Sequence, residues 1–122
     1  MTDHSFEFTR AITRRPARSV IDGLRAEDRG TPDFDQMSKD HAHYVATLRE
    51  TGAEIIELPA LDEFPDAVFV EDDALCLKNC AILMRPGAVS RVGEVAIMAP
   101  TIRAQYDDVS EITGPGFIEG GD

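Results

Sequence analysis

The segment that most constrains this chain spans residues 67 to 77 and reads AVFVEDDALCL. Its apolar residues are typical of a strand, but Glu71, Asp72 and Asp73 interrupt them. An unpaired carboxylate is costly to bury, so we predict a strand over 67–70 that ends at the acids. Side chains alternate along a strand, which would direct Glu71 and Asp72 to opposite faces. Asp66 lies six positions before Asp72 and would share its face; the alternative is a solvated strand end with turn-forming acids.

The charge balance bears on the partners and the location of the protein. The 122 residues fit one modest domain and include 12 Lys and Arg against 23 Asp and Glu, a net charge of −11. A surface this acidic repels phosphate backbones, and we therefore expect no nucleic-acid partner. The alternative is that the negative charge serves only to keep the protein soluble. Neither a signal peptide nor an apolar run long enough for a membrane span is evident, which favours a cytoplasmic protein without membrane contacts.

Strand and helix signals alternate along the chain and predict an α/β fold. Asp33 is a candidate N-cap and Gly52 a candidate C′ residue of one helix. A second helix would begin near Ser90, break or restart at Pro100 and end near Gln105. The predicted strands cover residues 6–13, 53–58, 67–70, 73–77, 81–84 and 108–112. A hairpin loop is expected at 78–79, a long loop with a helical turn near residue 20, and another strand starting at the end of the chain. We therefore expect the chain to be part of a larger fold.

Two arginines surround the turn RPGAVSR, at positions 85 and 91. The planar guanidinium binds carboxylates through a fork of donors, so Arg85 or Arg91 could hold an acidic group of a ligand. The alternative is a surface arginine at the start of a helix. Further on, IEGGD places Gly120 and Gly121 between two acids, which indicates either a close backbone approach or an ordinary glycine turn.

The two cysteines, Cys76 and Cys80, flank the predicted hairpin loop. They lack the further ligands of a metal site and a neighbouring histidine that would activate a nucleophile, and they form no disulfide framework. We interpret both as small buried apolar side chains.

Three motifs together carry a resemblance to a known family. FPDAVFVEDDA, RPGAVSR and GFIEGGD, in this order, resemble the dimethylargininase (dimethylarginine dimethylaminohydrolase) family of the guanidino-group-modifying superfamily. The resemblance implies a five-bladed α/β propeller of ββαβ units. Residues 1–122 would form the N-terminal part of its single catalytic domain, about the first two units and the start of a third.

The resemblance also implies an activity that needs no cofactor or metal. The family hydrolyses methylated arginines to citrulline and methylamines, through a cysteine that forms a covalent intermediate. By the resemblance, Asp72 would hold the guanidinium nitrogens of this small-molecule substrate, with Glu71 beside it. Asp66 would contact its α-amino end.

Three further residues receive roles from the same resemblance. Arg91 would bind the α-carboxylate, the backbone of Leu24 would touch the substrate from the long early loop, and Glu119 would orient the catalytic histidine. That histidine, the nucleophilic cysteine and a second carboxylate-binding arginine would lie beyond Asp122, so we predict that residues 1–122 alone are inactive.

Some features leave other functions open. Asp73 stands where the family usually has an uncharged residue, and Val92 where it has an arginine. The substrate could instead be arginine or another guanidine, hydrolysed or deiminated. A third reading is a non-catalytic binding or assembly module, whose exposed strand edges would favour homo-oligomers or other self-association.

Overall fold

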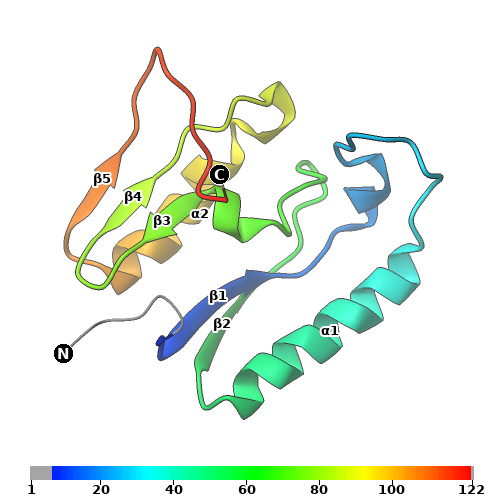
Figure 1. Ribbon diagram of the computed structural model, residues 1–122, viewed down its shortest axis with the longest axis horizontal. Helices are drawn as coiled ribbons and strands as arrows, with labels where there is room; N and C mark the ends of the chain where they lie inside the picture. The colour runs from blue at the N-terminus through cyan, green and yellow to red at the C-terminus, as the bar shows by residue number, and fades with distance from the viewer. Residues whose placement is uncertain (1–6, 122) are drawn as a thin grey trace. The chain divides into compact units, whose positions relative to one another are not determined.

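The computed structural model describes residues 7–121, which form two compact units divided between Val68 and Phe69 (Figure 1). The predicted strand residue Phe6 and the motif residue Asp122 lie outside the described residues. Each unit combines a small sheet with one α-helix, so the predicted α/β composition holds within each.

The first unit is a strand, a helix and a second strand (Figure 1). Strand β1 (Arg10–Arg14) pairs in parallel with β2 (Glu54–Leu58), and α1 (Phe34–Glu50) connects them. Asp33 caps α1 by accepting a hydrogen bond from the Gln36 amide, and Gly52 follows the helix with φ +92°. Both predicted helix boundaries are therefore confirmed. The long early loop contains the predicted helical turn, as the 3-10 helix η1 (Arg18–Asp22).

The second unit is a three-stranded sheet with one helix against it. The strand order is β3 (Ala74–Cys76), β4 (Ala81–Leu83), β5 (Val109–Glu111), with β3 antiparallel and β5 parallel to β4. The predicted hairpin is confirmed, because the Leu77 amide donates to the Cys80 carbonyl across Lys78 and Asn79. Ile118 forms an antiparallel bridge with Arg85, where the chain was predicted to begin another strand.

The prediction of a strand over residues 67–70 is wrong. Residues 65–68 form turns, and Val70–Asp72 is the 3-10 helix η2. Backbone bonds from the Asp72 amide to the Phe69 carbonyl and from the Asp73 amide to the Val70 carbonyl close these turns. Alternation between strand faces therefore does not govern Glu71 and Asp72. The apolar residues 67–70 are typical of a strand, but in the structure they belong to successive turns that lead into the acids.

Helix α2 (Glu94–Gln105) also departs from its predicted boundaries. Ser90 does not cap it, because residues Val89–Arg91 form a separate 3-10 helix, η3, and Gly93 is the N-cap. The helix continues through Pro100 without a restart. Pro100 is exposed, so the carbonyl group left without a helical donor faces water, while Val95, Met98 and Ile102 bury the opposite face.

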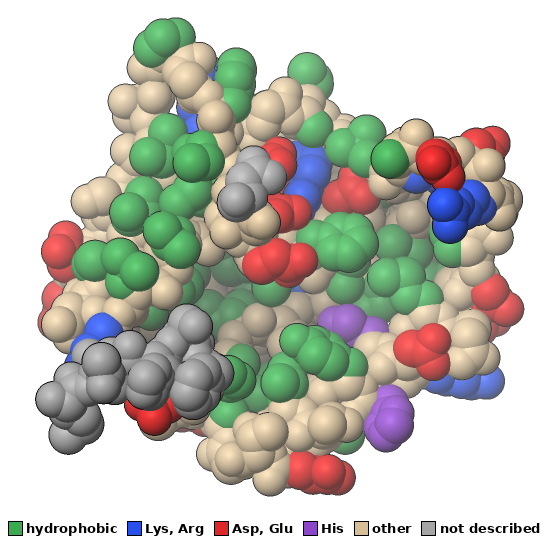
Figure 2. Space-filling view, in the orientation of Figure 1, with side chains coloured by type: hydrophobic (Ala, Val, Ile, Leu, Met, Phe, Trp, Pro, Cys, Tyr) green, Lys and Arg blue, Asp and Glu red, His purple; other side chains and the backbone are tan. Residues whose placement is uncertain are grey.

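Both cysteines depart from the buried positions predicted for them. Cys76 is exposed and Cys80 half-buried, because β3 is an edge strand. Figure 2 shows apolar side chains gathered over the sheet of the second unit, where Leu75 and Leu77 are also exposed. Among residues 7–121, no helix has the length and apolar character needed to cross a membrane.

Candidate functional site

Arg91 is the centre of a buried ion-pair network in the second unit. Its side chain reaches Glu94 through two hydrogen bonds, from Nε to Oε2 at 2.8 Å and from Nη2 to Oε1 at 2.9 Å. Nη1 donates to Asp72 Oδ2 at 2.6 Å, and Nη2 also donates to the Phe69 carbonyl. Only 5% of Arg91 is exposed, so it is not the surface arginine of the alternative interpretation.

The carboxylates around Arg91 determine its protonation. Burial alone would lower the pKa of Arg91, but the hydrogen bonds to Glu94 and Asp72 outweigh it, and the pKa is raised. Arg91 therefore stays charged throughout the accessible pH range. This fixed charge offsets the negative charge of the half-buried Asp72 and lies close to the buried Asp73 that follows it.

The network has more negative than positive charge. Asp72 and Glu94 bind Arg91 directly, and Asp73 Oδ1 lies 4.0 Å from Arg91 Nη2. When all four groups are ionised, three carboxylates face one guanidinium, which leaves a surplus of two negative charges. A cation that reaches Asp72 would reduce this surplus, whereas an anion would increase it. The charge of the network therefore favours a cationic ligand.

The paired glycines pack directly against the acidic turn. A Cβ atom on Gly121 would lie 2.3 Å from Asp72 Oδ1, and one on Gly120 would lie 2.3 Å from the Glu71 carbonyl oxygen. The Gly120 amide also donates to the Asp72 carbonyl at 3.1 Å. Neither glycine has a positive φ, so close approach is the reason for glycine here. This contact brings the half-buried Glu119 next to the segment that contains Glu71 and Asp72.

The first unit contains a second pair of predicted site residues. The Leu24 amide donates to both carboxylate oxygens of Asp66, at 3.2 Å each. Asp66 is buried, and a Cβ atom on Gly23 would lie 2.6 Å from its Oδ1. Asp66 therefore fixes the backbone of the long early loop at Leu24, whose side chain is exposed. No local pattern in the sequence predicts this contact between residues 42 positions apart.

Sequence reasoning also missed Glu94, which is only 1% exposed. Its signal was its spacing, because Arg91 and Glu94 are three residues apart at the start of a helix, where such pairs meet. Asp73, which the sequence left unexplained, is equally buried, and its carbonyl accepts a hydrogen bond from the Met84 amide. It is part of the scaffold that joins the acidic turn to β4.

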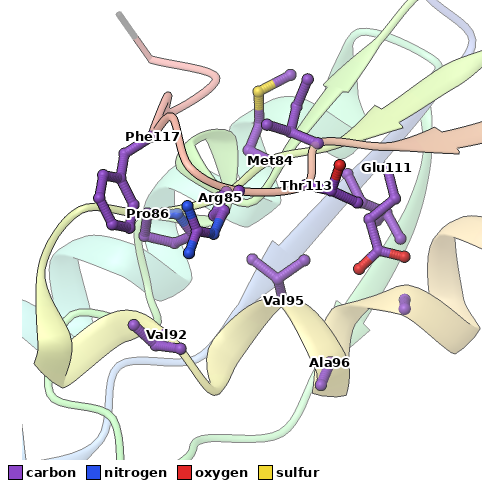
Figure 3. A pocket seen from close by; sticks show the side chains of 13 residues that line it. Met84, Arg85, Pro86, Val92, Val95, Ala96, Glu111, Thr113 and Phe117 are labelled. Carbon is purple, nitrogen blue, oxygen red and sulfur yellow. The ribbon is translucent and has the colours of Figure 1, made fainter.

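Arg85, the other candidate arginine, is engaged elsewhere in the same unit. Its Nη1 donates to the Gly116 carbonyl, and its guanidinium lies 4.2 Å from the centre of the Phe117 ring. A pocket of about 380 Å³ is lined by Arg85 and Phe117 on one side and by Val92 and Val95, the latter in α2, on the other (Figure 3). None of the acids that bind Arg91 lines this pocket. The pocket is therefore separate from the charged network.

Comparison with known proteins tests the resemblance. No protein-family model matches the chain. The N(G),N(G)-dimethylarginine dimethylaminohydrolase of Pseudomonas aeruginosa is 43% identical over 116 residues, which are 94% of this chain and 46% of that protein. The resemblance to dimethylargininases is confirmed. The chain spans about half the length of the curated dimethylargininases that it matches, which include one from Streptomyces coelicolor at 33% identity.

Solved structures confirm the fold prediction. A mutant of the P. aeruginosa dimethylargininase, complexed with citrulline, superimposes with a TM-score of 0.93 and covers 96% of this chain, which in turn covers 46% of that structure. The N-terminal domain of ArgZ, a cyanobacterial arginine dihydrolase, has a TM-score of 0.78 over 89% of this chain and 41% of that structure, at 18% identity. At this identity the second match shows a shared fold alone. The chain thus has the fold of the matching part of this α/β-propeller structure, which is about half of it.

Proposed function

We propose that the full-length protein hydrolyses N-omega-methylated arginines, such as dimethylarginine, to citrulline and methylamines. The observation that carries the proposal is the 43% identity to a dimethylargininase over 94% of the chain. The surplus of negative charge around Arg91 supports it, because the reacting group of the substrate is a planar cation.

The proposed roles follow the positions of the acids in each unit. Asp72, with Glu71 beside it, binds the guanidinium nitrogens in the second unit. Asp66 binds the α-amino group, and the backbone of Leu24 touches the substrate. The hydrogen bonds from the Leu24 amide to Asp66 support this pairing, since they hold loop and acid together before a ligand arrives.

Arg91 and Glu119 complete the proposed set. Arg91 binds the α-carboxylate of the substrate, which would have to join or compete with Asp72 and Glu94 for its donors. Glu119 orients the catalytic histidine. Its position beside Gly120, whose amide binds the Asp72 carbonyl, supports a place next to the guanidinium.

The chemistry itself would be performed by residues that follow Asp122. In the proposed reaction, a cysteine thiolate attacks the guanidinium carbon, and the protonated dimethylamine leaves. Water then attacks the covalent adduct, which releases citrulline and regenerates the thiolate. Residues 1–122 bind and orient the substrate but do not supply the nucleophile.

Activity of the full open reading frame tests the proposal. Purified full-length protein should form citrulline from dimethylarginine faster than from arginine, and residues 1–122 alone should form none. Faster turnover of arginine would favour a hydrolase or deiminase of the same superfamily instead. A stop codon directly after residue 122, with ligand binding by a stable monomer, would favour a binding module and overturn the proposal.

We also propose that the enzyme is cytoplasmic and has neither nucleic-acid nor membrane partners. The net charge of −11 supports the lack of nucleic-acid binding. The edge strands β3 and β5 could support association between copies. Size-exclusion chromatography of the full-length protein and of residues 1–122 would measure this association.

A further inference from the structure

We propose that Glu94 is a positioning residue that fixes the orientation of Arg91, and through Arg91 that of Asp72, for binding of the guanidino substrate. The inference rests on the proposed function and adds to it a residue that does not itself touch the ligand. Glu94 is 1% exposed, so it acts through its neighbours.

The geometry of the contact carries the argument. The two oxygens of Glu94 accept from Nε and Nη2, the two donors on one edge of the guanidinium. Two parallel bonds fix the plane of the group, which a single bond would leave free to rotate. Once that edge is held, Nη1 is directed at Asp72 Oδ2. Asp72 thereby has one oxygen fixed by Arg91.

The position of Glu94 in the chain makes its two-bond contact with Arg91 rigid. Glu94 lies in the first turn of α2, where the helix dipole favours a carboxylate. Arg91 belongs to the short helix η3 immediately before it. Helix α2 is anchored by the buried side chains of Val95, Met98 and Ile102. The orientation of Arg91 is thus fixed relative to a packed helix, and the bond from Arg91 to Asp72 connects the acidic turn η2 to that helix.

A double-mutant cycle in the full-length enzyme tests this role. Glu94→Gln keeps the shape of the side chain but presents an amide NH2 to a donor of Arg91. We expect it to lower kcat/KM for dimethylarginine at least tenfold, and Arg91→Lys to lower it by a similar factor. The double variant should lose no more than Arg91→Lys alone, because Glu94 acts only through Arg91. Losses that multiply in the double variant would overturn the proposal.

The matched control is Asp35→Asn, which removes an exposed acid from the first turn of α1. It should leave kcat/KM within twofold of the wild type. A Glu94→Gln variant as active as this control would also overturn the proposal. If Glu94→Gln does not fold, as judged by thermal unfolding, Glu94→Asp enters the same cycle, since it keeps the charge but shortens the reach.

A spectroscopic measurement separates failure of this inference from failure of the proposed function. If the wild type does not turn over dimethylarginine, the proposed function fails, but the Arg91 Nε–H can still be observed by NMR in the full-length protein. We expect Glu94→Gln to shift this signal and accelerate its exchange with water, and Asp35→Asn to leave it unchanged. A signal that Glu94→Gln does not alter would show that Glu94 does not position Arg91.

Discussion

Arg91 Nη1 donates a hydrogen bond of 2.6 Å to Asp72 Oδ2, joining two side chains 19 positions apart in the sequence. The bond connects the acidic turn η2 to the segment that begins helix α2. It places a positive charge beside the half-buried Asp72 and within 4.0 Å of the buried Asp73, which reduces the cost of burying these two acids. Stability and ligand binding in the second unit should therefore depend on the same arginine.

Replacing Arg91 should be strongly destabilising. Arg91→Met leaves buried carboxylates without their counter-charge, and breaking such a pair costs about 3–5 kcal/mol. We expect a loss of this size in the free energy of unfolding, measured in urea on the full-length protein. The control is Arg103→Met, because Arg103 is half exposed and its ion pair with Glu111 is long, at 4.0 Å. This substitution should change the free energy of unfolding by less than about 1 kcal/mol. Equal losses for the two variants would contradict the role of the network.

Alanine at the paired glycines should displace the acids of the site. Gly121→Ala would place a methyl group 2.3 Å from Asp72 Oδ1, and Gly120→Ala would place one equally close to the Glu71 carbonyl. We expect each to lower kcat/KM for dimethylarginine at least tenfold, Gly120→Ala more severely because backbone must move. Gly116→Ala, which meets no atom within 4 Å, should retain nearly full activity. Steady-state kinetics of the three variants would decide, and three similar rates would rule out the close approach.

His41 should make the stability of the protein pH-dependent. Burial lowers its pKa below the ordinary value of 6.5, although the charge of Glu57 acts in the opposite direction. The unfolded chain therefore binds a proton more readily than the folded one, so stability is full above pH 6.5 and falls as the pH drops through it. His41→Gln should flatten the dependence of Tm on pH between about pH 7 and pH 5. The exposed His43 offers the control, and a pH profile that His41→Gln leaves unchanged would refute the expectation.

The cysteines of this chain should be dispensable for catalysis and should not bond to each other. Cys76 pairs with Ala81 and Leu77 with Cys80, so the two thiols project from opposite faces of the hairpin. Cys76 is exposed as a residue, but partial burial of its thiol raises the pKa, and the hydrogen bond with Tyr106 only partly offsets this. We expect Cys76→Ser and Cys80→Ser to retain turnover within twofold, and mass spectrometry after mild oxidation to detect no intramolecular Cys76–Cys80 bridge.

Local signals predicted the elements whose ends depend on neighbouring residues. The Asp33 cap, Gly52 and the Lys78–Asn79 loop act through backbone geometry over a few positions, and all three were correct. The strand predicted over 67–70 failed because the apolar residues there serve a series of turns. Pro100 did not break α2. The destabilisation that a proline causes within a helix depends on whether it lies on the packed or the exposed face, and the sequence alone did not reveal that Pro100 is exposed.

The site was predictable residue by residue only through the resemblance, and its assigned roles remain predictions. The sequence did not reveal the contacts between distant segments, such as Leu24 with Asp66 or Gly121 with Asp72. These depend on tertiary folding. The contact between Glu94 and Arg91 could be predicted from their spacing of three residues, but the burial of Glu94 depends on the packing of α2.

Two of the proposed ligand-binding acids are each met at close range by a glycine from a distant segment: Asp66 by Gly23, and Asp72 by Gly121. Each acid therefore occupies space that exists only because the opposing residue has no side chain. Efforts to redirect this scaffold to other guanidines would have to vary acid and glycine as pairs. A library that randomises the acids alone can accept only side chains that fit the space left by the glycines. A library that randomises the glycines alone would mostly place new side chains in steric clash with the acids.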